Sequence, residues 1–178
     1  MVDVLRERWK VSVYPTDSSY FCFDLETTQT AASTLPLTVN KYHYGGVALR
    51  GPTSWVKTKD KDQAADDATQ VESSFFLNDK GSDRIQGNHE HARWVVLSGE
   101  RDGKSVSIAV LSHSENFRTP QAARLHPTKP YFCFGPCIDD GFVIDSDHPY
   151  HAKYRYLVTD AEPNAKWLDE QWKSWCGE

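Results

Sequence analysis

Two short runs of β-branched and apolar residues, joined by a charged turn, most constrain how this chain can fold. The runs are Arg93 to Leu97 and Val106 to Leu111, and the segment Gly99 to Lys104 between them contains two glycines. This arrangement is typical of an antiparallel β-hairpin. We therefore expect the chain to be organised around an antiparallel sheet that contains this hairpin.

Further strands are predicted on both sides of the hairpin, because other apolar or alternating runs are bounded by turn-forming residues. In the run from Tyr20 to Glu26, period two places Phe21, Phe23 and Leu25 on one face, which is expected to point into the core. The additional strands are expected at residues 9–14, 20–26, 34–39, 47–50, 71–77, 131–134, 141–144 and 151–159.

The C-terminus changes from period two to a helical period. Ala165, Leu168, Trp172 and Trp175 recur at spacings that place them on one helix face. A helix is therefore predicted at about residues 162–176, with Asp160 as a capping residue. Together these patterns predict an all-β fold, an antiparallel β-sandwich with one C-terminal amphipathic α-helix, in a single domain over residues 1–178.

Two segments carry no strand signal. Residues 52–70 are polar, of mixed charge and without periodicity, which predicts an exposed, mobile loop. Gly45 and Gly46 are adjacent, and such a pair either permits a close backbone approach or supplies a positive φ at a bulge. Both interpretations remain open.

Charge and hydropathy exclude several classes of protein. The net charge is −5 and the basic residues are dispersed, so nucleic acid is not an expected partner. Nowhere do about 18 apolar residues run together, and the charged N-terminus does not have the pattern of a signal peptide. We expect a soluble protein with no membrane partner, and a cytoplasmic location is favoured. The four scattered cysteines are expected to be free thiols.

A long polar segment follows the hairpin, from Ser112 to Pro130. Polar loops of this length in compact domains are functional or disordered, so a solvated loop is the alternative to a site. Histidine offers a proton shuttle near neutral pH, and arginine offers a fork of donors for hydroxylated or carboxylated ligands. The candidate catalytic residues are His113 and His126, and the candidate substrate-binding residues are His43, Arg50, Asn116, Arg118 and Arg124.

The metal-binding signals are weak. His89 and His91 would point to the same side of an extended segment, as paired ligands on a strand do. Cys133 and Cys137 have a spacing compatible with a zinc turn, but no second cysteine pair follows, which favours buried thiols. No nucleophile elbow, phosphate loop or dinucleotide fingerprint occurs, and no cofactor is predicted.

Several motifs, in this order, resemble the C-terminal half of a bacterial family of soluble proteins labelled methane oxygenase PmoA. The likeness covers most of the chain after Tyr20, and it implies a β-sandwich similar to sugar mutarotases and other carbohydrate-active supersandwiches. The N-terminal half of that family, with its paired-histidine segment, has no counterpart here. The motifs are Tyr44 to Gly51, Ala92 to Gly99, Leu111 to Arg118, Leu125 to Phe132 and Tyr154 to Tyr156.

The resulting expectation is a carbohydrate-related protein. One form of it is an enzyme acting on a sugar or glycoside in one cleft, with a histidine as general acid or base and an arginine orienting the ligand. The residues expected in that cleft are His113, Asn116, Arg118, His126, His43 and Arg50. The alternative is a non-catalytic carbohydrate-binding or protein-interaction module. The expected ligand is a small molecule or an oligosaccharide. Because the missing half would leave sheet edges and apolar faces uncovered, we also expect a homodimer.

Overall fold

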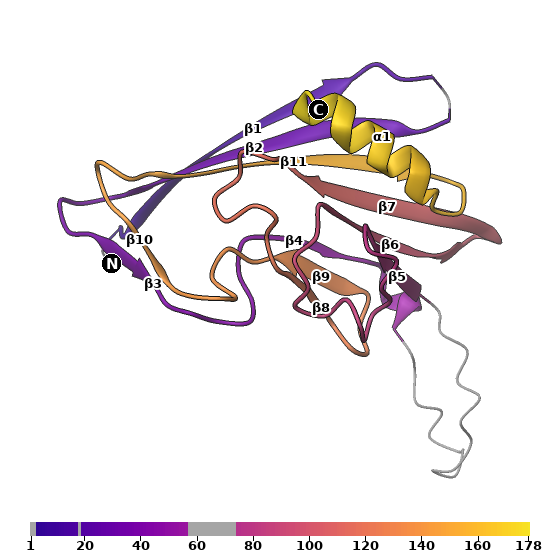
Figure 1. The fold of residues 1–178 in the computed structure, drawn as a ribbon, viewed down its shortest axis with the longest axis horizontal. Helices are drawn as coiled ribbons and strands as arrows, with labels where there is room; N and C mark the ends of the chain where they lie inside the picture. Colours follow the sequence, from indigo (N-terminus) through magenta and orange to yellow (C-terminus); the bar gives the residue numbers. More distant parts are fainter. Residues whose placement is uncertain (1–2, 18, 57–73) are drawn as a thin grey trace, which may run out of the picture.

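The structure is a computed structural model that describes residues 3–17, 19–56 and 74–178. As predicted, it is an antiparallel β-sandwich with one C-terminal helix (Figure 1). Its elements in chain order are β1 (Leu5–Tyr14), β2 (Phe21–Ala31), β3 (Leu37–Val39), β4 (Val47–Arg50), the 3-10 helix η1 (Thr53–Trp55), β5 (Ser74–Asn78), β6 (Trp94–Arg101), β7 (Lys104–Ser112), β8 (Ala123–Leu125), β9 (Tyr131–Phe134), β10 (Phe142–Ile144), β11 (Tyr150–Thr159) and α1 (Ala165–Cys176).

The larger layer is a six-stranded sheet in the order β1-β2-β11-β7-β6-β5, and every neighbouring pair is antiparallel. The predicted hairpin is β6 and β7. Its strands run further than the apolar runs indicate, so the turn is only Asp102 and Gly103 rather than Gly99 to Lys104. Both turn residues have positive φ, +52° and +74°, as a type I′ hairpin turn requires.

The second layer consists of the three-stranded sheet β4-β9-β8 and the two-stranded sheet β10-β3, on one side of the large sheet (Figure 1). The main core lies between the layers. Phe132 and Phe134 of β9 are fully buried there, and Phe134 stacks on Tyr154 of β11 with ring centroids 6.0 Å apart. The other residues of β9 therefore face away from the core.

Helix α1 covers the opposite side of the large sheet (Figure 1). Leu168 and Trp172 are buried against the sheet, as the helical spacing predicts. The helix is capped by Asn164, whose side chain accepts from the Trp167 amide, and not by Asp160. Asn164 directly precedes the first helical turn, whereas Asp160 lies one residue beyond the end of β11, too early in the chain to cap it.

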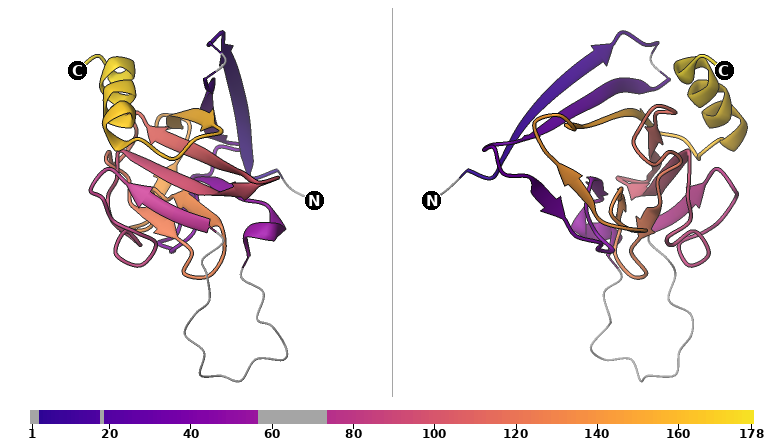
Figure 2. Two further views of the ribbon diagram at one scale, coloured as in Figure 1. Left: turned by 90° about the vertical axis from the view of Figure 1, so that its right-hand side faces the viewer. Right: turned by 60° about the vertical axis from the view of Figure 1, so that its left-hand side comes forward.

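Both faces of β2 are used. Phe23 and Leu25 pack against the main core as predicted, but Phe21 is 49 % exposed. The opposite face, with Cys22 and Asp24, is buried because α1 covers it. Figure 2 shows the β1 and β2 pair standing away from the three-stranded sheet. Trp9, Val11 and Val13, on the same face of this pair as Phe23 and Leu25, are exposed.

The segment predicted as an exposed loop, residues 52–70, contains a buried residue near its start. Trp55 is only 3 % exposed and donates its indole N–H to the Glu100 carbonyl oxygen at 2.7 Å. The prediction of an exposed loop is therefore wrong at this end, because the Trp55 side chain belongs to the main core. The remainder of that prediction, from residue 57 onward, falls outside the described residues. The four cysteines are free, as expected.

No helix among residues 3–17, 19–56 and 74–178 is both long and apolar enough to cross a membrane.

Candidate functional site

The outer face of the three-stranded sheet gathers cationic and aromatic side chains. Because side chains alternate along a strand, the burial of Phe132 and Phe134 directs Tyr131 outward. In the same way, Arg124 lies between two core residues of β8 and points outward. Arg50, at the end of β4, is paired with Tyr131 in the sheet register. Three strands thus place three polar side chains on one surface.

These side chains form a continuous row of contacts together with Tyr44. The Arg50 guanidinium carbon lies 5.0 Å from the centre of the Tyr131 ring. The Tyr131 and Tyr44 rings are 5.7 Å apart, and the Arg124 guanidinium carbon lies 5.5 Å from the Tyr44 ring. We call Arg50, Tyr131, Tyr44 and Arg124 the cationic-aromatic ladder. Each arginine faces an aromatic ring within cation-π range.

The glycine pair explains how Tyr44 reaches this surface. Gly45 and Gly46 have φ values of +136° and +74°, which residues with a Cβ rarely adopt. A Cβ on Gly46 would overlap the Phe134 carbonyl oxygen, and one on Gly45 would lie 2.8 Å from the Cys137 sulfur. Both features considered for the pair are therefore present: a close approach to neighbouring atoms and a positive φ. The pair folds the preceding residues over the edge of the sheet.

The cations of the ladder keep unused donors. Arg124 donates from Nη1 to Asn88 Oδ1 at 2.7 Å and to the Leu125 carbonyl oxygen at 3.0 Å. Its buried Nε has no hydrogen-bond partner among the described residues. Arg50 and Lys129 form no side-chain hydrogen bond or ion pair within the same part of the chain. A ligand can therefore use the donors of Arg50 and Lys129 without breaking a hydrogen bond or ion pair of the described residues.

His126 borders the ladder with a defined tautomer. Its Nδ1 accepts from the backbone amides of Thr128 and Lys129, at 3.2 and 3.1 Å, so the proton of the neutral ring is on Nε2. Its ring lies 6.5 Å from that of Tyr131. Burial lowers the pKa of His126, and the positive charge of Arg124 lowers it further. His126 is therefore a neutral donor at physiological pH.

His89 and His43 lie at the Tyr44 end. The His43 ring is 4.5 Å from the Tyr44 ring. Desolvation lowers the pKa of His89, and the nearby charge of Arg124 acts in the same direction. Neither imidazole has a hydrogen-bond partner within the described ranges, so the nitrogens of both are available to a ligand. Burial also raises the pKa of Tyr131 to about 12, which keeps its hydroxyl protonated.

The structure separates the other predicted site residues from this surface. His113 lies on the α1 side of the large sheet, with its ring 4.7 Å from that of Trp175 and its Nδ1 accepting from the Glu115 amide at 3.2 Å. Burial and the charge of Lys153 lower its pKa. The expectation of one cleft containing both His113 and His126 is wrong, because β8 divides the segment Ser112 to Pro130.

Asn116 and Arg118 hold the fold together. The Asn116 side chain bonds both the amide and the carbonyl of Lys153, at 2.7 and 2.9 Å, and is almost fully buried. Arg118 donates to the carbonyl oxygens of Pro136, Asp140 and Gly141. These donors and acceptors are already used by backbone groups, so neither side chain is placed to bind a substrate.

The metal site suggested by His89 and His91 assumed an extended segment, and this assumption is wrong. His89 has a left-handed backbone conformation, with φ +69°, so the two side chains do not follow the alternation of an extended strand. Both nitrogens of His91 have partners, the Pro120 carbonyl oxygen at 2.7 Å and Asp139 Oδ2 at 3.1 Å. In the described ranges no three histidine, cysteine, aspartate or glutamate side chains come together as metal ligands do.

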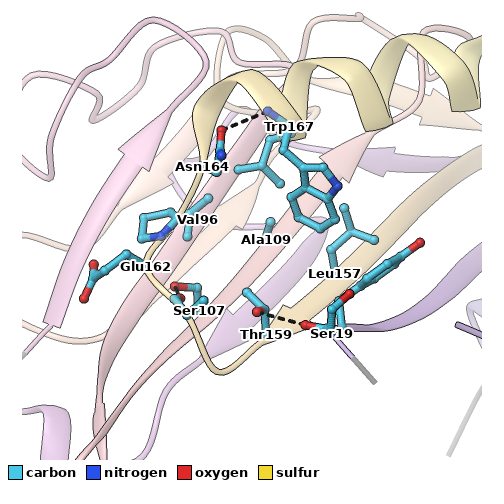
Figure 3. A pocket seen from close by; sticks show the side chains of 13 residues that line it. Ser19, Val96, Ser107, Ala109, Leu157, Thr159, Glu162, Asn164 and Trp167 are labelled. Carbon is cyan, nitrogen blue, oxygen red and sulfur yellow. Dashed lines mark hydrogen bonds between the residues drawn. The ribbon is translucent and has the colours of Figure 1, made fainter. Parts of the chain in front are cut away.

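A separate pocket of about 320 Å³ lies beneath the N-terminal end of α1 (Figure 3). Val96, Ala109 and Leu157 form its floor, and Trp167 forms one wall. Its polar rim is largely engaged within the protein; for example, the Thr159 hydroxyl donates to the Ser19 carbonyl oxygen at 3.2 Å. Glu162 is the one ionisable group of its lining besides tyrosine. The pocket therefore has little capacity for acid-base chemistry.

Sequence reasoning identified part of the ladder and missed the rest. Four of the residues that it selected, Arg50, Arg124, His126 and His43, lie on or beside this surface. It assigned Tyr131 only to a buried strand and His89 only to a weak metal motif. The alternation of β9 could have revealed Tyr131, since Phe132 and Phe134 must share the opposite face.

Comparison with known proteins gives a family and no assigned activity. A family model described as a family of unknown function (DUF6807) matches residues 2–173. No curated protein and no solved structure matches the chain.

Proposed function

The chain belongs to the family of unknown function DUF6807, and from its site we propose that it is a carbohydrate-related protein whose ligand binds on the cationic-aromatic ladder. The observation that carries this proposal is the row of contacts on one sheet face, which runs through Arg50, Tyr131, Tyr44 and Arg124. The predicted resemblance to PmoA-labelled and mutarotase-like sandwiches is consistent with this class of ligand.

The chemistry of the ladder matches that of a sugar ring. A sugar presents apolar C–H faces and hydroxyl edges. Tyrosine offers a broad apolar ring and one polar group, which suits the faces. Arginine offers several fixed donors, which suit the hydroxyl edges. Arg50 and Arg124 at the two ends of the ladder thus supply donors, and the two tyrosines between them supply the stacking surface.

In the catalytic form of the proposal, the histidines divide the proton transfer. His89 is the general base, because its nitrogens have no partner among the described residues and its lowered pKa keeps the ring neutral at pH 7. His126 donates from Nε2, since Nδ1 accepts two backbone amides. Tyr131 is a second donor because its hydroxyl stays protonated.

The rival function is a non-catalytic carbohydrate-binding module. In this form the stacking of Tyr44 and Tyr131 and the arginine donors hold the ligand, and the imidazoles only contribute contacts. The same surface supports both forms, so the distinction depends on whether His89 is needed for turnover rather than for binding.

A glycan array followed by product analysis tests both forms. We expect the Tyr131→Ala protein to lose binding, whereas Trp175→Phe, a change on the α1 side, retains it. If the protein is an enzyme, His89→Ala binds the same glycan but leaves it unchanged, while the wild type converts it. If wild type and His89→Ala both bind without conversion, the module is the correct form. Binding unaffected by Tyr131→Ala would refute the proposed surface.

A further inference from the structure

The charge on the ladder surface is opposite to that of the whole chain. The protein carries a net charge of −5, yet Arg50, Arg124 and Lys129 are placed on or beside one small sheet. Within the described ranges none of these three side chains forms an ion pair. By contrast, Arg93 pairs with Asp79 at 2.8 Å and Arg155 pairs with Asp24 at 2.7 Å.

Among the residues that the structure describes, no acidic side chain pairs with the cations of the ladder. Asn88, a neutral amide, is the side chain that accepts from Arg124. The nearest acidic influence on His89 is Asp139, and its carboxylate already lies 3.1 Å from His91 Nε2. Burial lowers the pKa of His126, and the positive charges of Arg124, Lys129, Arg84 and Arg50 lower it further. Within the described part of the chain, the positive charge of this surface is therefore uncompensated.

We propose that the ligand of the ladder is an acidic saccharide, one whose sugar ring carries a carboxylate. This inference rests on the proposed function and names the substrate class of the same surface. The planar guanidinium group matches a carboxylate through two parallel hydrogen bonds, which a neutral hydroxyl cannot accept in the same geometry.

Arg124 is the residue best placed to hold the carboxylate. Its Nη1 is fixed by Asn88 and Leu125, and this anchoring orients the group. Its Nε is buried without a hydrogen-bond partner among the described residues, so the donors left for a ligand are those of Nη2, which forms no hydrogen bond within the described ranges. Its guanidinium plane is supported by the Tyr44 ring. Arg50, at the other end of the ladder, supplies a second free fork of donors for the same or a neighbouring sugar unit.

The test is a glycan array with three sets of oligosaccharides, neutral, uronate-containing and sulfated, probed with the full chain at 50 and 300 mM NaCl. We expect selective binding to uronate-containing glycans, weakened by the higher salt. Arg50→Gln and Arg124→Gln should each weaken this binding about tenfold or more, because each removes hydrogen bonds to a charged group. Lys166→Gln also removes one positive charge, but on α1, and should change uronate binding less than about twofold.

The outcomes separate this inference from the function on which it rests. Binding of neutral glycans that is lost in Tyr131→Ala, without preference for uronates, overturns the acidic ligand and retains the carbohydrate site. Binding to sulfated glycans alone overturns the carboxylate. If uronate binding is insensitive to Arg50→Gln, Arg124→Gln and Tyr131→Ala, or if no glycan binds, both proposals fail. Arg50→Gln keeps the test valid should Arg124→Gln unfold, because Arg50 forms no side-chain hydrogen bond within the described ranges.

Discussion

Asp24 shows how single residues on the α1 side are fixed by buried polar contacts. Its carboxylate is 1 % exposed and accepts from Arg155 at 2.7 and 3.0 Å. Tyr14 and Trp175 donate to the same carboxylate at 2.9 and 3.1 Å. Four donor contacts thus compensate the burial of one charge, and they link β1, β2, β11 and α1.

Removing this carboxylate should be strongly destabilising. We expect Asp24→Ala to lower the free energy of unfolding by about 3–5 kcal/mol, because it leaves the largely buried Arg155 charge unpaired. Lys10→Ala, which breaks the exposed pair with Glu26, should cost less than about 1 kcal/mol. Urea unfolding of the two variants makes the comparison, and equal losses would contradict the role assigned to the buried pair.

The histidines make stability depend on pH in a known direction. Burial and Lys153 lower the pKa of His113, so the unfolded chain binds a proton more readily than the folded one. This contribution to stability is present above the ordinary imidazole pKa of about 6.5 and is lost as the pH falls through the lower folded value. We expect His113→Gln to reduce the loss of stability between pH 7.5 and pH 5, measured by urea unfolding. If the variant loses as much stability between pH 7.5 and pH 5 as the wild type, protonation of His113 is not the cause of that loss.

At the scale of elements, strand and helix positions were largely readable from the sequence, and the division of the long polar segment was not. Local periodicity identifies a hairpin such as β6 and β7 because each strand has one face to bury. It does not reveal β8, which is three residues long and has only one polar residue between two apolar ones. The separation of His113 from His126 follows from that short strand.

The turn of the central hairpin gives a test at this scale. Gly103→Ala should destabilise the protein by about 1–2 kcal/mol, because φ +74° is unfavourable for a residue with a Cβ, although an added Cβ would meet no atom within 4 Å. Asp102→Gly, at the neighbouring position of positive φ, should not destabilise the hairpin through backbone strain, because glycine adopts this φ readily. Thermal unfolding of both variants measures the difference. Equal stability of Gly103→Ala and wild type would contradict the type I′ geometry.

The whole molecule leaves an apolar surface uncovered at one edge. Trp9, Val11 and Val13 of β1 are 64 %, 57 % and 61 % exposed, and Phe21 of β2 lies on the same face. We still predict a homodimer that buries more than about 1,000 Å² in total, because a second copy would cover these apolar side chains and pair with the free edge of β1. Val11→Glu should then give a monomer. Light scattering that gives the wild type a mass near 20.3 kDa would contradict the dimer.

The most direct test of the ligand surface is an amide NMR titration of the isotope-labelled chain with tetragalacturonate. The account predicts shifts concentrated in residues 42–50, 88–91 and 123–134, which contain the cationic-aromatic ladder and its three histidines. It predicts no comparable shifts around Trp167 and the pocket beneath α1. Shifts confined to that pocket, or none up to millimolar ligand, would contradict the assignment of the site.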